Sequence, residues 1–129
     1  MTTEPPTNAS SRNVDPGRAA PRTVIVRYKT TEAHAAANEA LVRAVYGELR
    51  RRAPAGFHYA TFKLADGLSF LHFAITETGE DNPLTALPQF QEFQRQLKER
   101  CQEPPVVTEL TAVDGYAMPA LAGGQEGPR

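Results

Sequence analysis

The sequence lacks tryptophan, has a single cysteine and contains no long apolar run. One cysteine excludes an internal disulfide framework. No stretch approaches the ~20 apolar residues that span a bilayer, and the N-terminus has no hydrophobic signal-peptide core. These absences predict a cytoplasmic protein that does not enter a membrane.

Charge and metal ligands are also sparse. The formal net charge is −1, which gives no general attraction to nucleic acid or to anionic membranes. No glycine-rich phosphate loop opens a helix, and no pair of histidines has the spacing of metal ligands. Cys101 has no evident activating base and is expected to be a half-buried structural thiol. We therefore expect no metal, no cofactor and no nucleic-acid partner.

The two ends of the chain are poor in large apolar residues. Residues 1–22 consist mainly of Pro, Ser, Thr, Asn and Ala, and residues 115–129 are similar. Segments of this composition cannot bury enough surface to offset the entropy of ordering. The sequence predicts a disordered N-terminal tail over 1–22, one folded domain over 23–114 and a flexible C-terminal tail over 115–129.

The spacing of apolar residues within this domain predicts five segments. They are a strand over 23–29, a helix between Thr31 and Pro54, a hairpin over 57–75, a helix from Leu84 or Pro88 to Arg100, and a strand over 106–113. Pro104 and Pro105 are expected to end the second helix. The order β-α-β-β-α-β predicts an α+β fold of the ferredoxin-like type, in which two helices cover one face of a four-stranded antiparallel sheet.

The hairpin is the most informative segment. Asp66 and Gly67 form the dipeptide preferred in a two-residue type I′ turn, which would pair Ala65 with Leu68 and Thr61 with His72. Because side chains alternate along a strand, this register sorts them onto two faces. One face carries Ala60, Phe62, Leu64, Leu71, Phe73 and Ile75. The other carries Tyr59, Thr61, Lys63, Phe70, His72 and Ala74.

The first face is apolar throughout, and we expect it to pack against the helices. The second is too polar for a dry core and too aromatic for a solvated surface, so it is typical of a cavity wall. Two copies packed face to face would enclose it as an internal chamber. The sequence therefore predicts a homodimer.

The element order and several short segments resemble one protein family. The segments are the opening strand Val24 to Tyr28, Asn82-Pro-Leu84, Phe90-Gln-Glu-Phe93, and the last strand Pro105 to Leu110. Over residues 23–114 they resemble the antibiotic-biosynthesis-monooxygenase-like branch of the dimeric α/β-barrel proteins. Members of this group include cofactor-independent oxygenases, haem-degrading enzymes, isomerases, decarboxylases and proteins of no known activity.

The resemblance implies a small cofactor-independent monooxygenase acting on an aromatic or polyketide-like compound in the barrel cavity. Such oxygenases deprotonate a bound phenol-like substrate, whose anion then gives an electron to oxygen. His72 is the candidate base, because an unperturbed imidazole exchanges protons near neutral pH. The candidate substrate-binding residues are Tyr59, Thr61, Phe70 and Arg27, and Arg27 would stabilise an anion if it faces the chamber.

Alternatives remain open at this point. The haem-degrading branch fits worse, because its catalytic tryptophan is missing here. His72 has a structural interpretation as well, in which it bonds to Thr61 directly opposite. The protein is then a non-catalytic barrel that binds a small ligand, or one whose chamber is only a dimer core.

Overall fold

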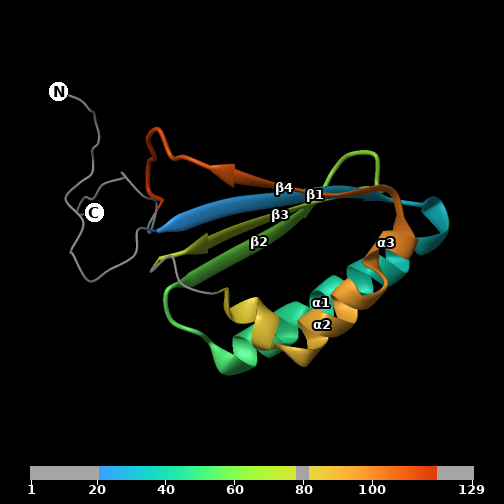
Figure 1. Ribbon diagram of the computed structural model, residues 1–129, viewed down its shortest axis with the longest axis horizontal. Helices are drawn as coiled ribbons and strands as arrows, with labels where there is room; N and C mark the ends of the chain where they lie inside the picture. The colour runs from blue at the N-terminus through green and yellow to red at the C-terminus, as the bar shows by residue number, and fades with distance from the viewer. Residues whose placement is uncertain (1–20, 78–81, 119–129) are drawn as a thin grey trace.

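The computed structural model describes residues 21–77 and 82–118. Its elements in chain order are β1 (Arg22–Thr30), the 3₁₀ helix η2 (Glu32–His34), α1 (Ala35–Arg52), β2 (Phe57–Lys63), β3 (Ser69–Thr76), the 3₁₀ helix η3 (Pro83–Ala86), α2 (Pro88–Arg95), α3 (Leu97–Arg100) and β4 (Cys101–Leu110). The strands form an antiparallel sheet in the order β2-β3-β1-β4. Figure 1 shows α1 and α2 on the same face of this sheet. The predicted ferredoxin-like α+β fold is confirmed, while residues 1–20 and 119–129 of the predicted tails lie outside the described residues.

The first helix ends where the sequence predicted. Ala53 adopts a left-handed backbone with a φ of +46°, and its N–H donates to the carbonyl of Leu49 at 2.7 Å. Arg51 and Arg52, in the last turn, both pair with the carboxylate of Glu48, which lowers the pKa of Glu48 to about 2. Arg50, Arg51 and Arg52 all lie in the last turn of α1, where positive charge is favourable to the helix dipole.

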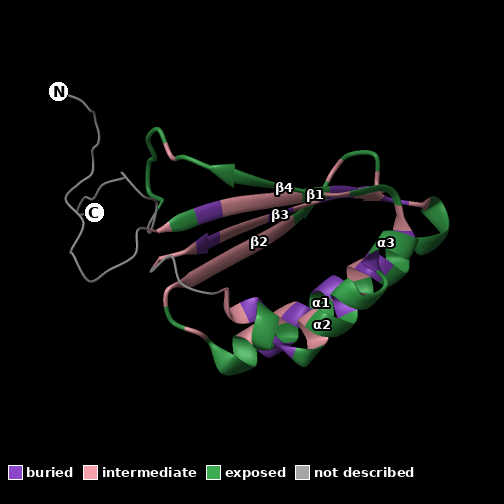
Figure 2. Ribbon diagram, viewed as in Figure 1, coloured by how far each residue is buried: buried purple, intermediate pink, exposed green. Residues whose placement is uncertain are grey.

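The second helical segment is broken, and the strand after it starts early. The asparagine side chain of Asn82 accepts from the N–H of Leu84 and begins η3, while Gln96 separates α2 from α3. Pro104 and Pro105 do not end a helix but lie inside β4, so that prediction is wrong. A strand at the sheet edge tolerates proline because its outer N–H groups have no ladder partner. Figure 2 shows β4 exposed along most of its length.

The hairpin has the predicted register but a different turn. Thr61 lies opposite His72, as expected. The N–H of Gly67 donates to the carbonyl of Leu64, and the N–H of Leu64 donates to the carbonyl of Ser69, both at 2.9 Å. Residues 65–68 therefore form a longer loop. The predicted type I′ turn is wrong, because Gly67 has a positive φ of +74° whereas the aspartate before it does not.

The carboxylate of Asp66 holds this loop together. It accepts from the hydroxyl of Ser69 at 2.7 Å and from the N–H groups of Leu68 and Ser69 at 2.8 Å each. These bonds, first of all that of the Ser69 hydroxyl, lower the pKa of Asp66 to about 2. Asp66 is thus a structural residue of the turn.

The helices cover the mixed face of the sheet, which carries Phe70 and His72 and was predicted to be open. The core consists of Tyr28, Val42, Val45, Phe70, Leu84, Leu87, Phe93 and Leu97. The prediction that Ala60, Phe62, Leu64, Leu71, Phe73 and Ile75 pack against the helices is wrong, and Phe62 is 54% exposed. Ile75 is buried but lies outside the core cluster. The mixed face with Phe70 and His72 packs against the protein's own helices, so no second chain is needed to cover it.

The turn gives a physical reason for this exchange. Opposite residues of an antiparallel pair alternate between hydrogen-bonded and non-hydrogen-bonded pairs. The predicted turn would close on Ala65 and Leu68, whereas the observed loop closes on Leu64 and Ser69. Residues predicted at hydrogen-bonded positions therefore occupy non-hydrogen-bonded positions, and the reverse, although the same residues stay opposite each other. Because amino acids are chiral, a residue at a hydrogen-bonded position of a strand with a given direction always carries its side chain on the same face of the sheet. Exchanging the two kinds of position therefore moves every side chain of the hairpin to the opposite face.

Candidate functional site

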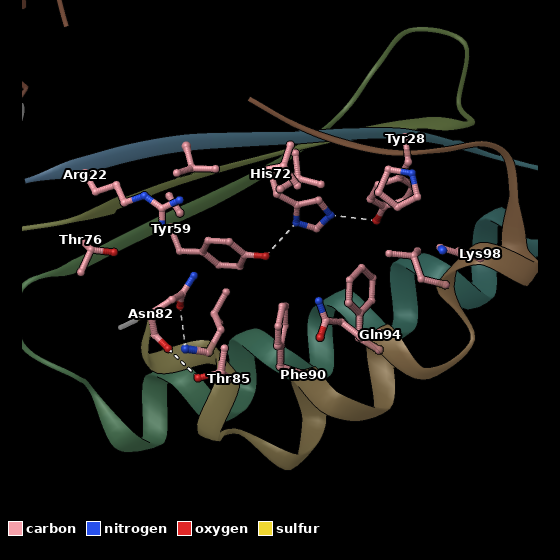
Figure 3. A pocket seen from close by; sticks show the side chains of 18 residues that line it. Arg22, Tyr28, Tyr59, His72, Thr76, Asn82, Thr85, Phe90, Gln94 and Lys98 are labelled. Carbon is pink, nitrogen blue, oxygen red and sulfur yellow. Dashed lines mark hydrogen bonds between the residues drawn. The ribbon is translucent and has the colours of Figure 1, made fainter. Parts of the chain in front are cut away.

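A cavity of about 530 Å³ lies between the sheet and the segment from η3 to α3. Figure 3 shows the side chains of the sheet and of the helices pointing into it from opposite sides. Its lining residues are mainly apolar and aromatic, and they include Val24, Val26, Tyr28, Tyr59, His72, Leu84, Phe90, Phe93, Leu97 and Val107. Arg22, Asn82, Thr85, Gln94 and Lys98 add polar groups. A cavity of this size and composition is typical of a small-molecule site.

His72 on β3 is the central polar residue of the cavity. Its side chain is almost fully buried, with 5% of the residue exposed. Nε2 lies 2.8 Å from the hydroxyl of Tyr28, and Nδ1 lies 2.9 Å from the hydroxyls of Tyr59 and Thr61. The predicted hydrogen bond to Thr61 is therefore present, and the two tyrosines add partners that the sequence analysis did not include.

Burial sets the protonation of these groups. Desolvation lowers the pKa of His72 to about 4, so the imidazole is neutral near pH 7. The expectation of an imidazole that exchanges protons near neutral pH is thereby corrected. Desolvation also raises the pKa of Tyr28 and of Tyr59 well above the usual value for a phenol. His72, Tyr28 and Tyr59 are therefore all neutral near pH 7.

A second set of buried polar groups supports Tyr28 from behind. The amide Nδ2 of Asn38 donates to the Tyr28 hydroxyl at 2.8 Å, and Arg100 Nε donates to Asn38 Oδ1 at 3.0 Å. Arg100 Nη2 also donates to the carbonyl of Phe93 at 2.7 Å, and its guanidinium lies over the Phe93 ring. Arg100 and Asn38 are both buried. Hydrogen bonds thus satisfy side chains that would otherwise be costly to bury.

The aromatic rings around His72 form a continuous cluster, in which Tyr28 and Tyr59 stack on the imidazole and Phe93 is tilted against it. The imidazole lies 5.4 Å from the ring of Tyr28, 5.9 Å from that of Tyr59 and 5.6 Å from that of Phe93, between ring centroids. Phe93 in turn stacks on Phe90 at 6.0 Å. Such neighbours hold the imidazole rigidly and offer flat apolar surface to a ligand.

No protein-family model matches the sequence, and no curated protein does. Solved structures do match it. Rv0793 from Mycobacterium tuberculosis is 23% identical, with a TM-score of 0.60 over 76% of this chain and 100% of its own. A Nitrosomonas europaea protein proposed to be an antibiotic biosynthesis monooxygenase is 14% identical, with a TM-score of 0.62 over 80% and 96%. A variant of SnoaB, a cofactor-independent oxygenase from Streptomyces nogalater, is 19% identical, with a TM-score of 0.58 over 78% and 100%.

The protein has the fold of the antibiotic biosynthesis monooxygenase-like proteins. The resemblance seen in the sequence is therefore confirmed for the fold. At these identities the likeness does not extend to substrate or reaction, which have to be argued from the site itself.

The fold brings together most, but not all, of the candidate site residues. Tyr59 and His72 line the cavity, and Thr61 supports His72. Phe70 is buried behind the cavity, where its ring stacks on that of Tyr28. Arg27 lies on the opposite face, because it pairs with Leu71 on β3 while its neighbour pairs with His72. Arg27 was a candidate only if it faced the cavity, and it does not, so its proposed role in stabilising an anion is corrected.

Sequence reasoning missed Tyr28, Asn38 and Arg100. One signal was present for Asn38, since it lies one helical turn before Val42 and two turns before Val45, on the buried stripe of α1. A polar residue on such a stripe requires a buried partner. Its partner Arg100 is distant in the sequence and could be located only in the folded chain.

The described residues offer neither a cluster of metal ligands nor a membrane-spanning helix. Within residues 21–77 and 82–118, no group of three or more His, Cys, Asp or Glu side chains could hold a metal ion. No helix in these same ranges has the length and apolar character needed to cross a membrane. Cys101 is a free, partly buried cysteine, and burial raises the pKa of its thiol.

Proposed function

We propose that the protein is a small cofactor-independent monooxygenase acting on an electron-rich aromatic or polyketide-like compound. One observation carries this proposal: the cavity of about 530 Å³ has apolar walls, and His72 and the hydroxyls of Tyr28 and Tyr59 meet in it. The fold shared with SnoaB, named as a cofactor-independent oxygenase, supports the same reaction class. The cavity volume lies within the ~300 to 1,000 Å³ of typical small-molecule sites.

The shape of the site favours a flat substrate. Phe90 and Phe93 line the helical wall, and Tyr59 and His72 line the sheet wall. Aromatic rings pack well against such surfaces through offset stacking. A fused aromatic compound with a hydroxyl or carbonyl group would place its rings between these walls and its oxygen near the tyrosine hydroxyls.

In this proposal, Tyr28 and Tyr59 connect His72 to the substrate. Both nitrogens of the imidazole are occupied by hydroxyl partners. A substrate hydroxyl would give its proton to the Tyr28 oxygen while Tyr28 passes its own proton to Nε2 of His72, and the Tyr59 hydroxyl would donate a hydrogen bond to the substrate anion. The resulting substrate anion lies beside an imidazolium, which raises the pKa of the ring above its value without that charge. The anion then reduces O₂ by one electron.

The reaction needs no external reductant for a substrate with an activated CH₂ group. In a hydroxylated anthrone, that carbon becomes a carbonyl. One atom of O₂ stays on the carbon, and the other leaves as water with the two hydrogens. The substrate supplies all the electrons.

Oxygen uptake with a hydroxylated anthrone tests the proposal. We expect turnover above the protein-free rate with a chelator present, and a fall of ~10² in Tyr59→Phe, which removes one hydroxyl from the cavity. Tyr116→Phe makes the same chemical change at an exposed site and should keep full activity. Uptake equal to the protein-free rate across a panel of hydroxylated anthrones and naphthohydroquinones would contradict an oxygenase.

A non-catalytic ligand-binding protein is the second candidate. The low pKa of His72 favours it, because an imidazole with a pKa of about 4 is a weak base toward a phenol. In this case the same compounds should bind, as measured by quenching of tyrosine fluorescence, without any oxygen uptake.

We also propose that the protein forms a homodimer through the open face of its sheet. Phe62 is 54% exposed and Val106 is 61% exposed on this face, Leu71 and Phe73 are half-buried there, and exposed Arg27 lies between Leu71 and Val106. An exposed surface that is largely apolar is typical of an interaction site. A two-fold related copy would present the same patch and cover it.

A further inference from the structure

The orientation of the buried amide of Asn38 is determined by its neighbour Arg100. A guanidinium has only donors, so the atom that Arg100 Nε contacts at 3.0 Å must be the oxygen of the amide. The nitrogen of Asn38 is then the atom that faces the Tyr28 hydroxyl at 2.8 Å. The reversed amide would place two donors against each other in a buried site, which is costly.

The orientation of the Asn38 amide also determines the direction of the hydrogen bond between Tyr28 and His72. The Tyr28 oxygen accepts from Asn38, and its own proton has Nε2 of His72, 2.8 Å away, as its acceptor. Nε2 therefore carries no proton. In a neutral imidazole the proton is then on Nδ1, which faces the hydroxyl oxygens of Tyr59 and Thr61 at 2.9 Å each.

We propose that Arg100 and Asn38 hold His72 in the Nδ1–H tautomer, which makes the Tyr59 hydroxyl the group that donates to a ligand in the cavity. Tyr59 accepts from Nδ1–H, so its own proton is not used by His72. Tyr59 lines the cavity, and its hydroxyl lies against both His72 and the hydroxyl of Thr61. Thr61 has a further hydroxyl partner in Tyr46, 2.8 Å away, so the Tyr59 proton can turn from Thr61 to an acceptor in the cavity.

The consequence is a preference among ligands. The cavity selects an aromatic compound with an acceptor oxygen, a ketone carbonyl or a phenolate, placed at the Tyr59 hydroxyl. This preference deepens the proposed function and rests on the cavity being the ligand site. The tautomer itself can be measured without any substrate or turnover.

Nitrogen NMR of the histidine rings is the first test. At pH 7 we expect the His72 ring to show a protonated Nδ1 and an unprotonated Nε2, with His72→Gln used to assign the signals among the three histidines. Asn38→Asp supplies an acceptor in place of the donor, so Tyr28 should donate to it and accept from Nε2–H. We expect this variant to show the opposite tautomer.

Asn38→Asp is also a variant that should fold, since it keeps the shape of the side chain and places a carboxylate beside Arg100. Asn82→Asp is the matched control, because this asparagine lines the cavity and caps η3 but lies outside the His72 network. It should keep the Nδ1–H tautomer. An Nε2–H ring in the unmodified protein, or an unchanged ring in a folded Asn38→Asp variant, would overturn the proposal.

The second test compares fluorenone with fluorene, which differ in one carbonyl. We expect the unmodified protein to bind the ketone roughly fivefold more tightly after correction for solubility. Tyr59→Phe should remove this preference, and so should Asn38→Asp, in which Tyr59 is intact but donates to Nδ1. If Asn38→Asp still prefers fluorenone to fluorene, Tyr59 donates to the ligand whichever tautomer His72 adopts. This result would overturn the proposed connection between the His72 tautomer and ligand preference.

The two proposals can fail separately. Absence of oxygen uptake, with the expected tautomers and ketone preference, rejects the oxygenase and leaves this inference intact. Turnover with an Nε2–H ring keeps the oxygenase and rejects the inference.

Discussion

The two faces of the sheet differ in where they carry their polar and their exposed apolar side chains. The face against the helices carries His72, Tyr28 and Tyr59, while the open face carries Phe62 and Phe73. The polar groups inside are satisfied by one another. On the open face, Phe62 is 54% exposed and Phe73 is half-buried. In the two proposals above, one face would hold a ligand and the other would meet a second copy.

The largest contrast should appear in stability. Phe93→Ala removes a buried ring that contacts the imidazole of His72 and the guanidinium of Arg100, and it should lower the free energy of unfolding by ~3 to 5 kcal/mol. Phe62→Ala on the open face should cost less than ~1 kcal/mol in dilute solution. Urea denaturation of both variants measures the difference. Equal losses would contradict the assignment of the faces.

The second contrast is the pH dependence of stability. The pKa of His72 is about 4 in the folded protein, against 6.5 ordinarily, so the unfolded chain binds a proton that the folded chain excludes between these values. Stability should be complete above pH 6.5 and fall as the pH drops toward 4, by about 3 kcal/mol in all.

His72→Gln should flatten this part of the curve, as measured by urea denaturation at a series of pH values. His58→Gln, at a half-exposed position, is the control and should keep the slope. Both variants should still lose stability at lower pH, where Asp66 becomes protonated, because the lowered pKa of Asp66 arises in the hairpin loop and not at either histidine. A slope that persists in His72→Gln would mean that another group carries it.

The third contrast is assembly. Phe62→Asp puts a charge on the most exposed apolar ring of the open face, on the edge strand β2, and should weaken the proposed dimer by ~100-fold or more without unfolding the chain. Sedimentation at several concentrations measures the effect, and Ala40→Asp on the exposed side of α1 should leave the dimer unchanged. A monomer at all concentrations in the unmodified protein would sink the dimer proposal.

The smallest effect is expected for Arg27→Gln. Arg27 is exposed on the open face, across the sheet from the cavity, so ligand affinity should stay within about twofold and stability within ~0.5 kcal/mol. Titration with a bound aromatic ketone checks this. A loss of tenfold or more would place Arg27 functionally at the cavity after all.

Much of the fold could be predicted from the residues alone. The apolar spacing of α1, with Ala53 and Pro54 after it, located the end of the helix, and the pairing of Thr61 with His72 was correct. The second helix and the last strand were less predictable. Pro104 and Pro105 would stop a helix, and only their position in an edge strand makes them compatible with β4.

About half of the candidate site could also be predicted from the sequence. His72, Tyr59 and Thr61 were singled out together because alternation along two paired strands places them on one face. Tyr28 was not, since it belongs to a third strand whose register depends on the whole sheet. Asn38 and Arg100 are 62 residues apart in sequence and meet only when α1 and the segment after α2 pack together.

The sequence by itself determined which residues share a face, because side chains alternate along any extended strand. Only the tertiary structure decided which face turns inward. That choice depended on the loop at Asp66, which shifted the hydrogen-bonded positions by one residue, and on partners that satisfied His72 once it was buried. The local sequence does not show which partners His72 will have. A polar group can be buried only when it is hydrogen-bonded, and here one partner, Tyr28, lies on another strand.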